Sequence, residues 1–115
     1  MFLIEAEALA RNNNESGSKT VFTTFMKTRV PTYTTSTQTG DAYITEIMNS
    51  RRVELWGEGF RFTDLKRLNL PLDRNGTNHN SALAVALTVP AGDNLWQWLI
   101  PQSEINANPL IKQND

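Results

Sequence analysis

The sequence predicts a mainly α fold, with a tetratricopeptide-like hairpin of two helices, a third long helix, and a loop-rich segment with short strands. Two observations carry this prediction. Apolar residues recur at helical spacing over residues 1–29 and again over 44–55. From residue 69 onward, proline, glycine and asparagine occur at turn spacing. We therefore expect a helical part, residues 1–68, and a loop-rich part, residues 69–115, with a short strand and a helical turn.

The first helix is predicted from Phe2, Ala6, Leu9 and Ala10, which lie at helical spacing. It is expected to stop at the segment NNNESGS, because asparagine, serine and glycine favour turns. Stacked helical pairs bury their apolar faces against neighbouring pairs. We therefore expect the apolar side formed by Phe2, Ala6 and Leu9 to stay exposed unless later segments cover it.

Ser18 is the expected N-cap of the second helix, and Pro31 is expected to end it. A short polar turn between two helices of about a dozen residues gives an antiparallel hairpin. Its span resembles one tetratricopeptide-like unit, although a single copy demonstrates no internal repeat. The predicted inner side of this second helix consists of Val21, Phe22, Phe25, Met26 and Arg29.

A surface loop is predicted for the segment PTYTTSTQTG, because threonine, serine and glycine dominate it. Asp41 is the expected N-cap of the third helix, which runs to about Trp56. Arg51 falls in the middle of the apolar stripe of this helix, and a buried arginine needs an acidic partner. The stripe consists of Ile44, Ile47, Met48 and Leu55, and the candidate partners are Glu5, Glu7 and Glu54.

A tight reversal is predicted after the third helix, where Gly57 and Gly59 supply a permissive backbone. In the short helix that follows, Asp64 lies close enough in sequence to pair with Arg61 or Arg67. The residues expected to face inward from the turn and this helix are Phe60, Phe62, Leu65 and Leu68.

The last third of the chain gives weaker signals. The segment ALAVALTV fits either a strand or a buried helical turn. The segment LWQWLIP alternates, which predicts a strand with Trp96, Trp98 and Ile100 on one side. A helical turn is then expected to stop at Asn108, and the polar tail IKQND is expected to fray. We expect all three tryptophans, including Trp56, to lie in the core.

Composition excludes several function classes. Eleven basic and twelve acidic residues leave a net charge of −1, so no long-range field attracts nucleic acid. The chain has no cysteine, and His79 is its single histidine, so we expect no metal site and no cofactor. No run approaches the roughly 18 apolar residues of a membrane span. Glu5 and Glu7 interrupt the apolar start and exclude a signal peptide, so the chain itself is expected to be soluble.

Charge is concentrated in residues 51–67, RRVELWGEGFRFTDLKR, which hold eight charged side chains, three aromatics and two glycines. Glu54 and Glu58 resemble a glycosidase pair only in residue type. Such carboxylates face each other across a cleft at about 5 to 9.5 Å, whereas these two lie four residues apart at a helix end. We therefore predict no catalytic residues, and favour a buried polar joint that locks helices together.

The same block, extended to RRVELWGEGFRFTDLKRL, is followed by LDRNGTNHN and then by IPQSEINANP. Together with the upstream LIEAEALAR, these blocks resemble the C-terminal region of the SusD/RagB family, the surface glycan-binding lipoproteins of Bacteroidetes. Their order and spacing match over nearly the whole chain. The resemblance implies a C-terminal piece of a larger all-α fold that contains tetratricopeptide-like pairs.

The resemblance also implies a function. Family members are not enzymes; they serve nutrient uptake and starch utilization by capturing oligosaccharides at the cell outer membrane. They act as a lid on a SusC-like TonB-dependent transporter. The resemblance implies that the membrane is reached only through a lipid anchor, which we expect to lie outside this chain. The alternative is a stand-alone helical interaction module that binds a peptide or a partner protein.

Two sets of site residues are expected. The resemblance implies that the charged positions that match the family block form the polar joint and do not contact sugar. These positions are Arg51, Arg52, Glu54, Glu58, Arg61, Asp64 and Arg67. The ligand-binding candidate is Tyr33, whose ring could stack on a sugar while neighbouring hydroxyls bond it. The competing interpretation is that Tyr33 anchors its own loop. Much of the glycan-contacting surface is expected upstream, so this region acts mainly as scaffold.

Overall fold

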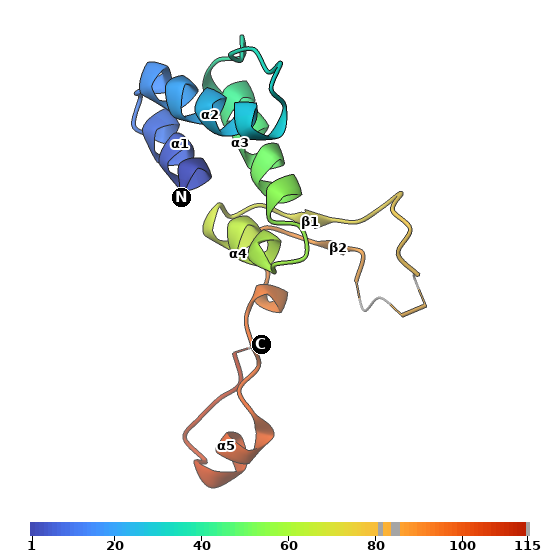
Figure 1. Ribbon diagram of the computed structural model, residues 1–115. Helices are drawn as coiled ribbons and strands as arrows, with labels where there is room; N and C mark the ends of the chain where they lie inside the picture. Colours follow the sequence, from blue (N-terminus) through green and yellow to red (C-terminus); the bar gives the residue numbers. More distant parts are fainter. Residues whose placement is uncertain (81, 84–85, 115) are drawn as a thin grey trace. The chain divides into compact units, whose positions relative to one another are not determined.

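The computed structural model describes residues 1–80, 82–83 and 86–114. Within these residues the chain is mainly helical, which confirms the predicted fold class (Figure 1). It divides into two compact units, residues 1–60 and 61–115. The elements are α1 (Phe2–Arg11), α2 (Glu15–Arg29), α3 (Gly40–Glu54), α4 (Phe60–Arg67), β1 (Leu72–Asp73), β2 (Thr88–Val89), a 3-10 helix (Asn94–Trp96) and α5 (Gln102–Ala107).

In the first unit, α1 packs against both α2 and α3. The prediction that its apolar side stays exposed is wrong for Ala6, which is fully buried, whereas Phe2 is 48% exposed. Leu3 and Ala6 form the inner face, because α3 covers the position that a further helical pair was expected to fill. Leu9 is only partly buried.

The start of α2 differs from the prediction. The helix begins at Glu15, and its N-cap is Asn14, whose side chain accepts a hydrogen bond from Gly17 N (3.0 Å). Ser18 is therefore not the cap; it lies one turn inside the helix and is fully buried. Its hydroxyl donates to Ala6 O (2.6 Å) and shares a hydrogen bond with the Tyr43 hydroxyl (3.0 Å). The helix ends at Arg29, before Pro31, as predicted.

Three aromatic side chains build the centre of this unit. Phe22 is 1% exposed, and its ring meets the rings of Tyr33 and Tyr43 edge to face, with centroids 6.0 and 6.1 Å apart. Such contacts add about 0.5–1.5 kcal/mol each to the burial of the rings. The rest of the buried cluster consists of Leu3, Ala6, Phe25 and Ile47.

A side chain of α2 caps the N-terminus of α3. Asp41 is not its N-cap; the cap position is Thr39, whose side chain makes no capping bond. The free N–H of Gly40 instead donates to the Glu15 carboxylate of α2 (2.9 Å). Glu15 also pairs with Lys19 (2.8 Å), one helical turn away. A carboxylate at a helix N-terminus satisfies an open N–H and interacts favourably with the helix dipole, so Glu15 ties α2 to the start of α3.

Acid is expected to weaken this tie. The Lys19 ammonium, and then the Gly40 N–H, hold the pKa of the Glu15 carboxyl below its ordinary value of 4.5. A carboxyl with a lowered folded-state pKa stabilises the fold above its unfolded-state pKa, and this contribution disappears as pH falls through the folded-state pKa. Thermal melts of the chain and of Glu15→Gln should differ at neutral pH and converge on the acid side of 4.5. An undiminished difference in acid would contradict the role of the charge.

Helix α3 ends at Glu54, and the reversal follows as predicted. Gly57 and Gly59 have φ values of 81° and 80°, in the left-handed region where a side chain is strained. They lead directly into α4, which begins at Phe60. The two glycines therefore fix where one helix stops and the next begins.

The second unit has a small core beneath α4. Strands β1 and β2 pair antiparallel, with Leu72 opposite Val89, and the buried residues are Leu65, Val89 and Trp96. Of the four residues expected to face inward, Leu65 is buried and Leu68 is partly buried. Phe60 and Phe62 remain about two-fifths exposed, at 41% and 42%. The Phe62 ring nevertheless contacts the core, because its centroid lies 5.6 Å from that of the buried Trp96.

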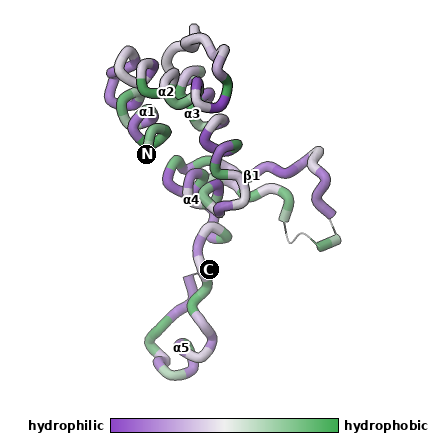
Figure 2. The backbone as a smooth tube through the Cα atoms, in the orientation of Figure 1, coloured by the Kyte–Doolittle hydropathy of each residue, from purple (hydrophilic) through white to green (hydrophobic). Residues whose placement is uncertain are grey.

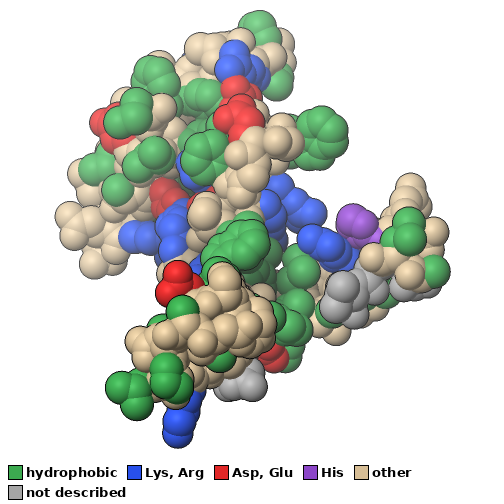
Figure 3. Space-filling model, turned by 90° about the horizontal axis from the view of Figure 1, so that it is seen from below, with side chains coloured by type: hydrophobic (Ala, Val, Ile, Leu, Met, Phe, Trp, Pro, Cys, Tyr) green, Lys and Arg blue, Asp and Glu red, His purple; other side chains and the backbone are tan. Residues whose placement is uncertain are grey.

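The predicted strand in LWQWLIP is wrong. Asp93 accepts a hydrogen bond from Leu95 N (2.8 Å) and starts a 3-10 turn instead, so the side chains no longer alternate. Trp96 is buried and its indole N–H donates to Pro90 O (2.7 Å). The expectation that all three tryptophans lie in the core therefore fails: Trp56 and Trp98 are each 85% exposed. Hydrophobic side chains also reach the surface at several places in Figure 3.

The segment ALAVALTV ends in strand β2, at Thr88–Val89, while Ala84 and Val85 lie outside the described residues. Helix α5 ends before Asn108, as predicted. The expectation that the tail frays is wrong for Gln113, whose side chain accepts a hydrogen bond from Ile100 N (2.8 Å) and donates one to Ile100 O (3.1 Å), while Asp115 lies outside the described residues.

Hydrophobic and hydrophilic residues are mixed along the helices (Figure 2). Among the residues that the structure describes, no helix is both long enough and apolar enough to cross a membrane.

Candidate functional site

Among the α3 residues predicted to belong to the polar joint, Arg51 is the most buried. It is 8% exposed and follows the fully buried Ile47 by one helical turn, as the apolar stripe predicted. Its guanidinium lies 5.3 Å from the centroid of the Phe60 ring. A cation over an aromatic face gains about 0.5–1 kcal/mol when exposed and about 2 kcal/mol when desolvated. The buried arginine therefore links α3 to the residue that starts α4.

Glu54 pairs with a residue of another helix. Arg29, the last residue of α2, donates from Nε to both Glu54 oxygens (3.1 and 3.0 Å) and from Nη2 to Oε1. This hydrogen-bonded contact lowers the pKa of Glu54 and raises that of Arg29. The Arg29 guanidinium also lies 5.5 Å from the centroid of Phe25 on its own helix. The pair thus joins the C-terminal ends of α2 and α3.

Sequence reasoning placed Arg29 on the inner side of α2 but did not find this pairing. The available signal was positional: Arg29 and Glu54 each fall in the last turn of a predicted helix. A cation in the last turn faces the negative end of the helix dipole, and a carboxylate there gains from a cationic partner. Glu7, another proposed partner for Arg51, is bound by Arg11 on the same helix (2.8 Å).

In the second unit, Asp64 is buried and accepts a hydrogen bond from Arg67 Nε (2.9 Å). This confirms the predicted pairing of Asp64 with one of its two neighbours in sequence. Arg61 is exposed, as are Arg52 and Glu58 of the first unit. Of the proposed joint residues, four belong to the first unit, Arg51, Arg52, Glu54 and Glu58, and three to the second, Arg61, Asp64 and Arg67.

Glu54 and Glu58, the two carboxylates compared with a glycosidase pair, lie in different surroundings. Glu54 is engaged by Arg29, and Glu58 lies on the surface of the turn after α3. Among the described residues, no three histidine, aspartate or glutamate side chains come together in a way that could hold a metal ion.

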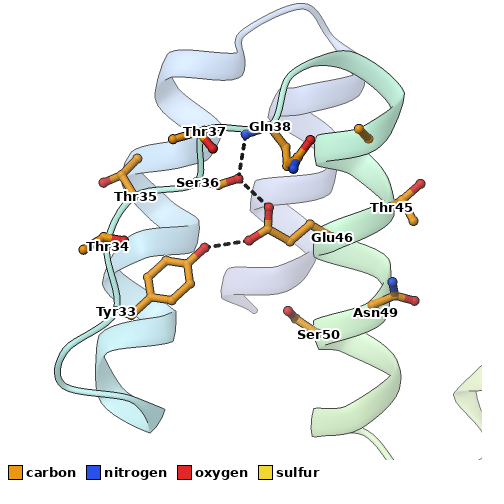
Figure 4. A pocket seen from close by; sticks show the side chains of 11 residues that line it. Tyr33, Thr34, Thr35, Ser36, Thr37, Gln38, Thr45, Glu46, Asn49 and Ser50 are labelled. Atoms are coloured by element: carbon orange, nitrogen blue, oxygen red, sulfur yellow. Dashed lines mark hydrogen bonds between the residues drawn. The ribbon is translucent and has the colours of Figure 1, made fainter.

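Tyr33 fixes the loop between α2 and α3. Its hydroxyl donates to Glu46 Oε1 (2.8 Å), and the Ser36 hydroxyl donates to the other oxygen of the same carboxylate (Figure 4). Ser36 Oγ also accepts a hydrogen bond from Gln38 N (3.1 Å). Burial, and then the bond to Glu46, raise the pKa of Tyr33. These contacts match the interpretation in which Tyr33 anchors its own loop, and its hydroxyl is already in use.

A hollow of about 730 Å³ lies beside this anchor, which we name the Tyr33 groove. Loop residues 33–38 form one side, and α3 forms the other. Tyr33 is not the most exposed aromatic of the chain, since Trp56 and Trp98 project much further into solvent. Sequence reasoning missed both, because a large aromatic in a small domain usually lies in the core. The α3 residues of the groove are Ala42, Thr45, Glu46, Asn49 and Ser50.

Comparison with protein families gives one match: the model of the SusD family, over residues 1–115. No curated protein and no solved structure matches the chain.

Proposed function

Because this chain belongs to the SusD family, we propose that it is part of a surface protein that captures glycans and delivers them to a SusC-like TonB-dependent transporter in the outer membrane. Family membership implies a general role in glycan binding and nutrient uptake, and the family is one of binding proteins. The specific partner, the surface location and starch-like substrates belong to the proposal.

In this proposal residues 1–115 act mainly as scaffold. The observation that carries it is that charged residues of the motif connect separate elements of the fold. Arg29 joins Glu54 across the ends of α2 and α3, and Arg51 lies over the ring of Phe60. Groups engaged in this way help to hold the helices at fixed positions. Arg51 is buried, and a buried charge favours one arrangement of helices over others, whereas the Arg29–Glu54 pair is exposed and contributes little stability.

The second candidate function is a helical module that binds a peptide or a partner protein. One observation favours it: a hollow of about 360 Å³ in the first unit is lined by Phe2, Ile4, Phe25 and Phe60. Phe2 and Ile4 are about half exposed, and charged side chains line the same hollow, namely Arg29, Arg51, Glu54 and Glu58. A hollow that offers both apolar and charged side chains suits an amphipathic helix.

The two functions predict different bound partners. A tagged form of the protein, purified from its own cells in mild detergent, is expected to co-purify with a TonB-dependent transporter. The purified protein is expected to bind neutral oligosaccharide, measured by isothermal titration calorimetry. No hydrolysis of that oligosaccharide is expected. Recovery of a soluble protein partner without the transporter, and no heat with any saccharide, would favour the interaction module instead.

A further inference from the structure

The Tyr33 groove has a rigid side that the fold itself maintains. The Glu46 carboxylate holds Tyr33 and Ser36, and the Tyr33 ring packs edge to face on the buried Phe22. The start of α3 is held separately by Glu15 through Gly40 N. Both ends of the loop are therefore fixed, and the groove beside it exists before any ligand arrives, which reduces the cost of ordering on binding.

A second set of groove side chains takes no part in holding the fold. Within the described residues, their hydroxyl or amide groups make no hydrogen bond to the protein. Figure 4 shows one of them, Ser50, one turn beyond Glu46 on α3 and pointing toward the loop. Both lone-pair acceptors and N–H or O–H donors are available in this set, which comprises Thr34, Thr37, Gln38, Asn49 and Ser50.

The charge and polarity of the groove select the class of ligand. Its single charged residue is Glu46, and no lysine or arginine lines it, so an anionic ligand meets repulsion without a compensating cation. An apolar ligand would have to displace water from hydroxyls and amides without replacing their hydrogen bonds. A neutral polyhydroxylated molecule supplies donors to Glu46 and both donors and acceptors to the amides. Bonds from ligand hydroxyls to a carboxylate are among the stronger hydrogen bonds.

We infer that the Tyr33 groove is a secondary binding subsite for a neutral saccharide chain, with Glu46, Asn49 and Ser50 as its contacts on α3. The ligand class rests on the proposed function as well as on the groove chemistry, whereas the location rests on the groove alone. The groove is shallow and has no free aromatic platform, so binding is weak, with Kd of about 1 mM. Its role is to add contacts along a chain that is held elsewhere, as expected for multivalent binding.

The test is an NMR titration of the ¹⁵N-labelled chain with neutral linear gluco-, fructo- and manno-oligosaccharides, and with an oligouronate as the anionic counterpart. Neutral chains are expected to shift the amide signals of Thr34–Gln38 and the side-chain signal of Asn49. The oligouronate is expected to leave them unchanged. Asn49→Ala and Ser50→Ala, which remove groups the fold does not use, should each weaken binding about fivefold. Asn78→Ala, which changes another exposed asparagine outside the groove, should not change it.

Several results would overturn the inference. Shifts centred on the indole signals of Trp56 or Trp98 would place saccharide binding elsewhere. Equal losses in Asn49→Ala and Asn78→Ala would show that Asn49 makes no specific contact. If no neutral saccharide moves any signal while the protein purified from cells still carries transporter and oligosaccharide, the subsite is wrong and the proposed function stands. If the purified protein carries no transporter but neutral saccharides still shift the groove signals, the subsite stands and the proposed partnership with the transporter is wrong.

Discussion

Phe22→Ala is expected to lower the free energy of unfolding of the chain by about 3–5 kcal/mol, the usual cost of removing a buried phenylalanine ring. Phe22 is 1% exposed, and its ring touches the rings of both Tyr33 and Tyr43. Its removal leaves a cavity among α2, α3 and the Tyr33 loop, because the neighbouring rings are hydrogen-bonded and cannot collapse into the space. Urea unfolding followed by the helical circular dichroism signal measures the loss.

The matched control is Phe62→Ala, which removes the same ring from a position that is 42% exposed. Its expected loss is well under half as large, because the ring is only partly removed from water on folding. Equal losses in the two variants would mean that Phe22 does not occupy the central position described above.

The second large effect is expected at Arg51. Arg51→Ala should destabilise the chain by about 2 kcal/mol, the value of a desolvated cation over an aromatic ring, since the guanidinium lies 5.3 Å from the Phe60 centroid at a site that is 8% exposed. Arg51→Met should cost less, because methionine keeps most of the packing of the arginine stem. Thermal melts of the two variants give the order of stability.

A double-mutant cycle separates the ring from the other contacts of Arg51. Phe60→Leu keeps an apolar side chain but removes the aromatic face, so its effect should shrink when Arg51 is already alanine. Additive losses would show that the ring contact contributes nothing measurable. An Arg51→Ala variant that melts with the parent chain would show that the buried charge does not hold the motif together.

Periodicity was sufficient for much of the first unit. The three helices, the loop after Pro31, the burial of Arg51 and the glycine-driven reversal all follow from local spacing and from what each residue type tolerates. Cap positions did not follow. Ser18 and Asp41 are good capping residues in isolation, yet Asn14 caps α2 locally while Ser18 is buried against Ala6 and Tyr43. At the start of α3, a carboxylate of another helix, Glu15, takes the place of a local cap.

The candidate site was less accessible to sequence reasoning. Tyr33 was identified by composition, but its bond to Glu46 joins residues thirteen positions apart on separate elements. The Arg29–Glu54 pair spans twenty-five positions. Such contacts depend on how α2 and α3 are placed in space. The tryptophans were harder still to place. A core of few residues leaves little periodicity in the sequence, so the sequence does not indicate that Trp96 is buried while Trp56 and Trp98 are exposed.

The Tyr33 groove separates residues that maintain structure from residues that face solvent, and this has a consequence for evolution. Tyr33, Ser36 and Glu46 cannot change without loosening the loop. Asn49 and Ser50 on α3 make no such contacts. Substitutions there should have little effect on folding, so selection acts on them mainly through binding. If saccharide binds in the groove as proposed, these positions can change one at a time, and each intermediate remains folded.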